Sequence, residues 1–278
     1  MANLETLPWH LHARTVLRVH NMLLLVGPPG VGKTAFAHAV SKEMTERGPI
    51  VIQGDPELSR DDIYGHTELR GDHTVVVDGP LTRALREGRH VVIEELNLMP
   101  HETRAAFLAL RGREEVQLPR TYETLPIPPS FRLIATSNQE SLRCRTNGML
   151  AQAVMDDFAV IEVPAVDDDV VSSFLSAQFP WTNEERRAEA IERWERFRQV
   201  ADDDSSSEDI EGKPVLGYRA LALYTKLVED GEMAPEEAER IALVNRYITD
   251  KDRHDAAKTL HSARSDRFFD EDVDEEWR

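Results

Sequence analysis

One short stretch of the chain reads Gly27-Pro28-Pro29-Gly30-Val31-Gly32-Lys33-Thr34, which fits the pattern G-x-x-x-x-G-K-[ST]. An apolar run at 22–26 precedes it and a helical pattern over 34–45 follows, so the stretch has the strand–loop–helix context that the pattern requires. Glycine allows such a loop to turn its backbone N–H groups inward around phosphate oxygens, and the helix adds the positive end of its dipole. The stretch therefore predicts a phosphate-binding loop in an α/β domain.

Two side chains of this loop have separate expected roles, with ATP and Mg²⁺ as the expected ligands. The ammonium group of Lys33 is expected to contact the β- and γ-phosphates, and the hydroxyl of Thr34 is expected to ligate Mg²⁺. The residues expected to bind the nucleotide are Gly27, Pro28, Pro29, Gly30, Val31, Gly32, Lys33, Thr34 and Ala35.

Short apolar runs alternate with helical patterns as far as residue 164. The expected buried strands are 22–26, 49–53, 90–94, 131–137 and 159–163, and the expected helices are 34–45, 80–87, 100–110 and 147–157. Strands rich in Val and Ile, each followed by a helix, favour a parallel sheet covered on both faces. Two further segments, 74–78 and 115–127, have the pattern of β-hairpins, and insertions of this kind tend to carry function.

The strand pattern ends after Pro164, and only helical patterns follow it. These helices are expected at 167–178, 183–200, 217–229, 234–248 and 250–263, with an exposed acidic loop at 202–212. The sequence thus predicts an α/β fold in which a P-loop NTPase core with a parallel sheet and β-hairpin insertions precedes a small all-helical lid. The expected core is 1–165, including a helical lead-in over 1–20, and it is followed by a lid over 166–265 and an acidic tail over 266–278.

Two acids end the apolar strand at 90–94. One acid at such a position is expected to hold Mg²⁺, usually through water, and the next to polarise the attacking water. We expect Glu94 to be the metal ligand and Glu95 the general base. The usual pair is Asp then Glu, so Glu94 is longer by one methylene but keeps the charge. The alternative is a solvated strand end, because acids are common in this chain.

Asn138 follows the strand at 131–137. Its neutral amide can orient water beside the γ-phosphate without competing with Glu95 for charge. An asparagine at the end of a strand is, taken alone, most often a turn residue. Its position after the other two motifs favours the functional interpretation.

The motifs together resemble those of the MoxR and NorQ/CbbQ group of AAA+ ATPases. The resemblance is carried by GPPGVGKT at 27–34, DIYG at 62–65, DGPLTRALREG at 78–88 and EELN at 94–97. It covers residues 20–165 and, more weakly, the lid to about residue 265. It implies a ring-forming, often hexameric ATPase that remodels or activates a partner protein, frequently one with a von Willebrand factor A domain or a metalloenzyme.

The resemblance also implies two arginine roles. In that group the segment before the last core strand usually ends in Asp-Arg-Phe, and its arginine reaches the nucleotide of the neighbouring subunit. Here Asp157 stands in the place of that arginine, with Arg143 and Arg145 as alternative cations or as solvated loop residues. Arg219 lies at a place comparable to the group's sensor 2 arginine, which contacts the γ-phosphate from the lid, and is otherwise a first-turn surface arginine.

The charge balance and the cysteine content bear on the partner, the source and the location of the protein. The 51 acidic residues outnumber the 33 basic ones and give a net charge of −18, which makes nucleic acid an unfavourable partner. This surface suits a halophilic source, or else reflects a GC-rich genome together with an acidic tail. Cys144 is a single cysteine and no segment fits a signal peptide or a membrane-spanning helix, so a cytoplasmic location is expected.

Three other functions are compatible with a phosphate-binding loop. One is a nucleotide-dependent scaffold with little hydrolysis, which Glu94 and Asp157 both favour. Another is a small-molecule kinase, although no Arg-rich pocket for a phosphate acceptor is evident. The third is a DNA-linked GTPase, whose Met-Asn-x-x-Asp signature is absent after the strand at 131–137, so ATP is preferred over GTP.

Overall fold

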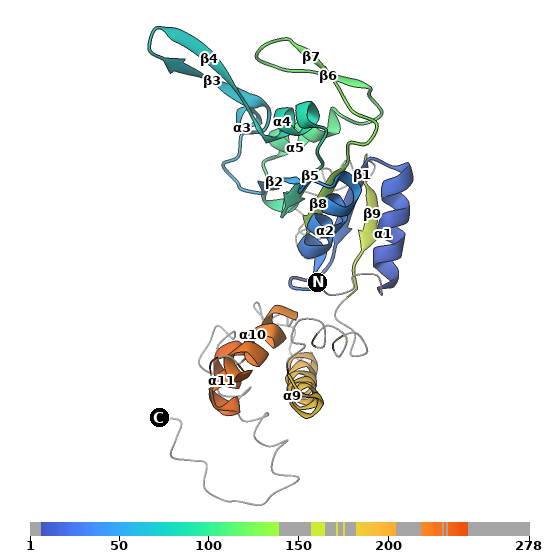
Figure 1. Ribbon diagram of the computed structural model, residues 1–278, viewed down its shortest axis with the longest axis vertical. Helices are drawn as coiled ribbons and strands as arrows, with labels where there is room; N and C mark the ends of the chain where they lie inside the picture. The colour runs from blue at the N-terminus through green and yellow to red at the C-terminus, as the bar shows by residue number, and fades with distance from the viewer. Residues whose placement is uncertain are drawn as a thin grey trace, which may run out of the picture. The chain divides into compact units, whose positions relative to one another are not determined.

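The computed structural model describes residues 7–138, 157–164, 171, 175, 182–203, 218–229, 231 and 233–243. The chain divides into two compact units, one formed by Leu4–Ala165 and the other by Val166–Arg278 with Met1–Asn3. In Figure 1 the first unit carries the strands and the second carries the helices α9 to α11. Among the described residues, no helix is long and apolar enough to cross a membrane.

A five-stranded parallel sheet forms the centre of the first unit and confirms the predicted α/β class. Its spatial order is β2-β5-β8-β1-β9. The strands are β1 (Met22–Val26), β2 (Ile50–Gln53), β5 (Val91–Glu94), β8 (Leu133–Ser137) and β9 (Ala159–Glu162). Because β8 lies between β1 and β5, the residues that follow these three strands meet at one edge of the sheet.

Burial differs between the central and the outer strands. Every residue of β1 and β8 is buried, whereas β2 buries Ile50 and Ile52 and exposes Val51 and Gln53. β9 likewise alternates between half-buried and exposed residues. The expectation that all five runs are buried was therefore wrong for the two outer strands, because an edge strand covered on one face needs apolar side chains at alternate positions only.

The helices of the first unit pack around this sheet (Figure 1). They are α1 (Pro8–Val19), α2 (Lys33–Thr45), α3 (Arg60–Tyr64), α4 (Pro80–Glu87), η1 (Leu96–Leu98) and α5 (His101–Leu108). α1 packs beside β9 and β1, and its His10 ring stacks on Phe36 of α2 at 4.6 Å between centroids. α5 ends earlier than predicted because the chain turns through Gly112, whose φ is 58°. Of the helix expected over 147–157, all but Asp157 lies outside the described residues.

Two hairpins extend from the same end of this unit (Figure 1). β3 (Gly65–Arg70) pairs with β4 (His73–Asp78), and β6 (Glu115–Gln117) pairs with β7 (Thr124–Pro126), both antiparallel. Arg86 of α4 links them, since it donates to Asp78 Oδ2 at 2.8 Å and to Glu123 Oε2 at 2.5 Å. The sequence predicted β4 and the second hairpin, but not β3 or α3.

His90 lies just before β5 and is almost completely buried. Its Nε2–H donates to the Ser130 carbonyl oxygen at 3.0 Å. Burial lowers the pKa of this imidazole below its usual range, and the hydrogen bond to Ser130 offsets the shift only in part. The folded protein therefore holds His90 neutral at pH values where the unfolded chain binds a proton.

This difference predicts that the protein loses stability as the pH falls. Below about pH 6.5 the unfolded chain takes up a proton on His90 that the folded chain excludes, so unfolding is favoured. We expect roughly 1 kcal/mol of the free energy of unfolding to be lost through this group between about pH 7.5 and about pH 5.5. Urea unfolding at both pH values, compared with His90→Gln, isolates the contribution. Equal losses in the two proteins would contradict the assignment.

The described part of the second unit is helical and contains α9 (Glu184–Asp203), α10 (Tyr218–Glu229) and α11 (Pro235–Ala242). α9 includes the start of the expected loop at 202–212. Val171 and Leu175 are helical and buried, while the rest of the expected helix over 167–178 and the helix over 250–263 lie outside the described residues.

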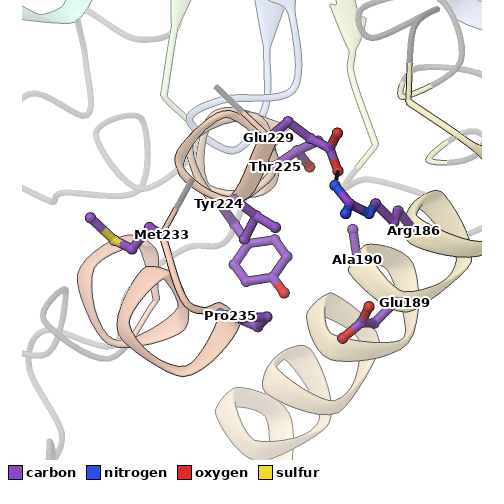
Figure 2. Close-up of a pocket in the computed structure, with 9 residues that line it drawn as sticks. Arg186, Glu189, Ala190, Tyr224, Thr225, Glu229, Met233 and Pro235 are labelled. Carbon is purple, nitrogen blue, oxygen red and sulfur yellow. Dashed lines mark hydrogen bonds and ion pairs between the residues drawn. The ribbon is translucent and has the colours of Figure 1, made fainter. Parts of the chain in front are cut away.

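A pocket of about 510 Å³ lies between these three helices (Figure 2). Arg186 of α9 forms an ion pair with Glu229 of α10 at 3.1 Å, and Figure 2 shows the Tyr224 ring directed into the space between the helices. Burial raises the pKa of Tyr224 to about 12, so its hydroxyl stays neutral. The lining residues are Arg186, Glu189, Ala190, Tyr224, Thr225, Val228, Glu229, Met233 and Pro235.

Candidate nucleotide-binding site

The loop between β1 and α2 depends on glycine for two different reasons. Gly30 and Gly32 have φ values of 79° and 94°, a left-handed conformation that other residues adopt only with strain. Gly27 instead has a close neighbour, since a Cβ atom there would lie 2.3 Å from the Val163 carbonyl oxygen. Gly32 is also the N-cap of α2, so the loop leads directly into the N-terminal end of that helix.

Lys33 lies in the first turn of α2 and its side chain folds back into the loop. Its Nζ donates to the carbonyl oxygens of Gly27 at 2.7 Å and Pro28 at 2.6 Å, and it lies 3.4 Å from Asn138 Oδ1. Only 6% of the residue is exposed. These contacts hold the ammonium group inside the loop, at the place where the pattern requires a cation for phosphate.

Glu95 follows β5 in an unusual backbone conformation, with φ 54° and ψ 53°. A residue with a side chain adopts this left-handed region at a cost of about 1 kcal/mol, and such strain is found mainly where surrounding contacts fix it. Here the Glu95 N–H donates to Thr136 Oγ1 at 3.2 Å, and the Glu94 carbonyl oxygen accepts from the Gly54 N–H at 2.7 Å. The chain therefore turns sharply between the two acids, and only Glu94 continues the strand.

Gly54 makes this turn sterically feasible, and the sequence reasoning missed it. A Cβ atom at this position would lie 2.1 Å from the Glu95 carbonyl oxygen and 2.8 Å from that of Glu94. The sequence does place a glycine directly after the run that forms β2. A glycine beside a strand often marks a place where two backbones come close, so a close approach here could have been predicted.

Asn138 connects the loop to the acid pair. Its Nδ2 donates to Glu95 Oε2 at 3.0 Å, and its Oδ1 faces Lys33 Nζ at 3.4 Å. One amide thus contacts both the cation and the expected general base, since β8 lies between β1 and β5. The preceding residue, Ser137, donates through its hydroxyl to Asn97 Oδ1 at 3.1 Å and so joins β8 to η1.

Glu94 contacts α2. Its Oε1 lies 2.9 Å from Nε2 of His38, which follows Thr34 by one helical turn. Residues four apart share one face of a helix, so Thr34 lies on the face of α2 that His38 turns toward Glu94. A hydroxyl and a carboxylate are oxygen donors of the kind that Mg²⁺ prefers, and Mg²⁺ is usually held by one or two protein oxygens together with phosphate and water. The residues present therefore fit the expected ion.

None of the three arginines considered as cations for the nucleotide has its side chain among the described residues. Arg143 and Arg145 lie outside them, and Arg219 lies in α10 of the second unit with its side chain outside the described part. Asp157 is paired with Arg111, which follows α5. The carboxylate at the expected arginine position therefore has its counter-charge within the same chain.

The Arg111–Asp157 ion pair provides a test of packing at this place. Only 11% of the Asp157 side chain is exposed, against 60% of the Arg111 side chain, so removal of the arginine leaves a largely buried carboxylate unpaired. We expect Arg111→Ala to reduce the free energy of unfolding by about 1 kcal/mol, and the neighbouring exposed Arg113→Ala to leave it near wild type. Urea unfolding of both variants measures the difference. Equal effects would show that the pair contributes nothing specific.

The topology and the loop define the class of protein. A parallel sheet with β8 between β1 and β5, a glycine-rich loop after β1, and two acids at the end of β5 form the core of a P-loop NTPase. Residues 22–155 match the family model of the AAA domain, dynein-related subfamily. The match supports a nucleotide-dependent AAA+ ATPase.

Several proteins are similar to this chain over much of its length. An uncharacterized protein of Staphylococcus epidermidis is 26% identical over 204 residues, which covers 71% of this chain and 76% of that protein. An uncharacterized protein of Staphylococcus saprophyticus is 28% identical over 172 residues, covering 60% and 64%. The structure of NtrX from Brucella abortus aligns with a TM-score of 0.44 and 18% identity over 85% of this chain, which spans about half (49%) of the NtrX chain.

Proposed function

We propose that this protein binds ATP with Mg²⁺ at the loop of residues 27–34, hydrolyses it, and uses the cycle to remodel or activate a partner protein, as a MoxR-like AAA+ ATPase. The observation that supports hydrolysis most directly is the Asn138 amide, which contacts both Lys33 and Glu95. A cation for phosphate, a carboxylate base and a neutral group that orients water are three of the protein groups that take part in ATP hydrolysis.

Each residue has a role in this proposal that its position supports. Lys33 exchanges its contacts with the loop carbonyls for phosphate oxygens, and Thr34 and Glu94 hold Mg²⁺. When bound, Mg²⁺ neutralises phosphate charge as it develops. Glu95 accepts a hydrogen bond from Asn138 Nδ2 through Oε2, and its carboxylate takes the proton of the attacking water, which Asn138 orients. For Arg219 the support is the resemblance to the MoxR group alone, in which an arginine at a comparable place is the sensor 2 residue.

Phosphate release by the purified chain tests hydrolysis and separates it from the alternatives. Release that requires Mg²⁺ and no acceptor supports the ATPase. ATP binding without phosphate release supports the nucleotide-dependent scaffold, and phosphate transfer to a small molecule supports the kinase. The Asn138–Glu95 hydrogen bond favours the ATPase over the other two, because a base already paired with a water-orienting amide serves hydrolysis.

The partner and the assembly are proposed on different grounds. The resemblance to the MoxR group supports a cytoplasmic ring, often a hexamer, with a protein client that carries a von Willebrand factor A domain. The two hairpins at one end of the core provide a surface for such a client, and Arg86 ties them together. The net charge of −18 makes nucleic acid an unfavourable partner. Native mass spectrometry with and without ATP tests the ring.

A further inference from the structure

His38 forms a contact with the acid pair that neither the loop pattern nor the strand pattern assigns. Its Nε2 lies 2.9 Å from Glu94 Oε1, and the two side chains are 40% and 24% exposed. His38 is mounted on α2 between the buried residues Ala37 and Val40, so its backbone position is fixed by the core. It therefore meets Glu94 from a rigid element rather than from a loop.

We propose that His38 is a positioning residue that fixes the Glu94 carboxylate for Mg²⁺, an inference that rests on the proposed function. A glutamate at a position usually held by aspartate has one more side-chain torsion, so its carboxylate can occupy more orientations. The hydrogen bond to Oε1 restricts this freedom and leaves Oε2 as the oxygen directed to the ion or its water. Hydrogen-bond partners of metal ligands commonly orient them in this way.

The chemistry of the contact favours positioning over direct ligation. Mg²⁺ prefers oxygen donors and binds imidazole nitrogen poorly, so His38 is a poor ligand for this ion. A carboxylate oxygen only accepts, so Nε2 is the donor, and it donates in the neutral Nε2–H tautomer and in the charged ring alike. Glutamine has an amide N–H that can take the place of Nε2–H, and it is therefore the conservative replacement.

The test measures Mg²⁺ binding without turnover. Affinity of the full chain for a fluorescent ATP analogue is recorded in EDTA and then across a Mg²⁺ titration, which gives the Mg²⁺ concentration at half-saturation. We expect His38→Ala to raise that concentration about 10-fold, the usual scale for loss of a partner that orients a metal ligand. Affinity in EDTA should stay within about 2-fold, and His38→Gln should restore most of the Mg²⁺ response.

Two further variants link the effect to Glu94. Lys42→Ala removes an exposed residue one turn further along α2 and should match wild type. Glu94→Asp shortens the side chain by one methylene, so its carboxylate no longer reaches Nε2. In that background His38→Ala should change the half-saturation by less than about 2-fold, because neighbours that act together are not additive.

The result that would contradict the role of His38 differs from the result that would contradict the proposed function. An unchanged Mg²⁺ half-saturation in His38→Ala, or the same increase in the Glu94→Asp background, shows that His38 does not act through Glu94. An equal loss of affinity in EDTA shows a structural effect on the loop and also overturns the inference. Wild-type protein that binds no ATP analogue at all contradicts the proposed function instead.

Discussion

Glu95→Gln is expected to lower ATP turnover by at least about 100-fold while ATP binding stays close to wild type. Glutamine keeps the size of the side chain but cannot accept the proton of the attacking water. The Glu95 turn is fixed by backbone contacts, and the amide oxygen of a glutamine can still accept from Asn138 Nδ2, so the turn should persist. Steady-state phosphate release and equilibrium binding of a fluorescent ATP analogue measure the two quantities separately.

Glu94→Gln is the matched comparison, because the two acids are adjacent and differ in role. This change should raise the Mg²⁺ concentration needed for activity, since a neutral amide is a weaker ligand than a carboxylate. Thermal unfolding of both variants checks that the core is intact. Turnover that survives Glu95→Gln and disappears in Glu94→Gln would mean that the roles of the two acids are reversed.

The class of fold was predictable because its signals are local in the sequence. Apolar runs followed by helical patterns and the glycine-rich loop indicated a parallel α/β core, and the sheet confirms it. The strand order β2-β5-β8-β1-β9 could not be predicted in this way. Parallel strands pair across long crossovers, and the residues of one strand do not indicate which strands lie beside it in the sheet. That order is what brings Asn138 between Lys33 and Glu95.

The missed strand β3 shows where the local signals fail. Its residues Gly65–Arg70 are polar at most positions, and the hairpin with β4 is largely exposed on both faces. Strands are recognised from alternation between a buried and an exposed face, and a hairpin outside the core has no such requirement.

The sequence allowed the residues of the site to be predicted, but not the backbone conformation that positions them. Lys33 was predicted from the loop pattern and Glu95 and Asn138 from their positions at the ends of strands, and in the structure Asn138 contacts both of the others. The left-handed conformation of Glu95 could not be predicted, because glutamate is not a residue that favours it. The backbone that approaches Gly54 could not be predicted either, because it belongs to residues that are distant in the sequence. The position of His38 was predictable, because it lies one helical turn after Thr34 on α2.

Lys33→Ala is expected to remove most ATP binding. Charge-assisted hydrogen bonds contribute about 1.5–3 kcal/mol each, so loss of the ammonium group from the phosphates should weaken binding by about 100-fold or more. The side chain also donates to the carbonyl oxygens of Gly27 and Pro28, so its removal leaves two loop acceptors without this donor. Isothermal titration with ATP measures the affinity, and thermal unfolding reports any loosening of the loop.

Lys33→Ala removes both the positive charge at the phosphates and the donor to the loop carbonyls. Lys33→Arg keeps the charge, but its bulkier guanidinium does not fit among the loop carbonyls. We expect this variant to bind ATP poorly as well, since the ammonium group is almost enclosed by Gly27, Pro28 and Asn138. Lys42→Ala on the exposed side of α2 should retain wild-type affinity, which excludes a general effect of removing positive charge from this helix. Unchanged ATP affinity in a folded Lys33→Ala protein would contradict the assignment of the loop.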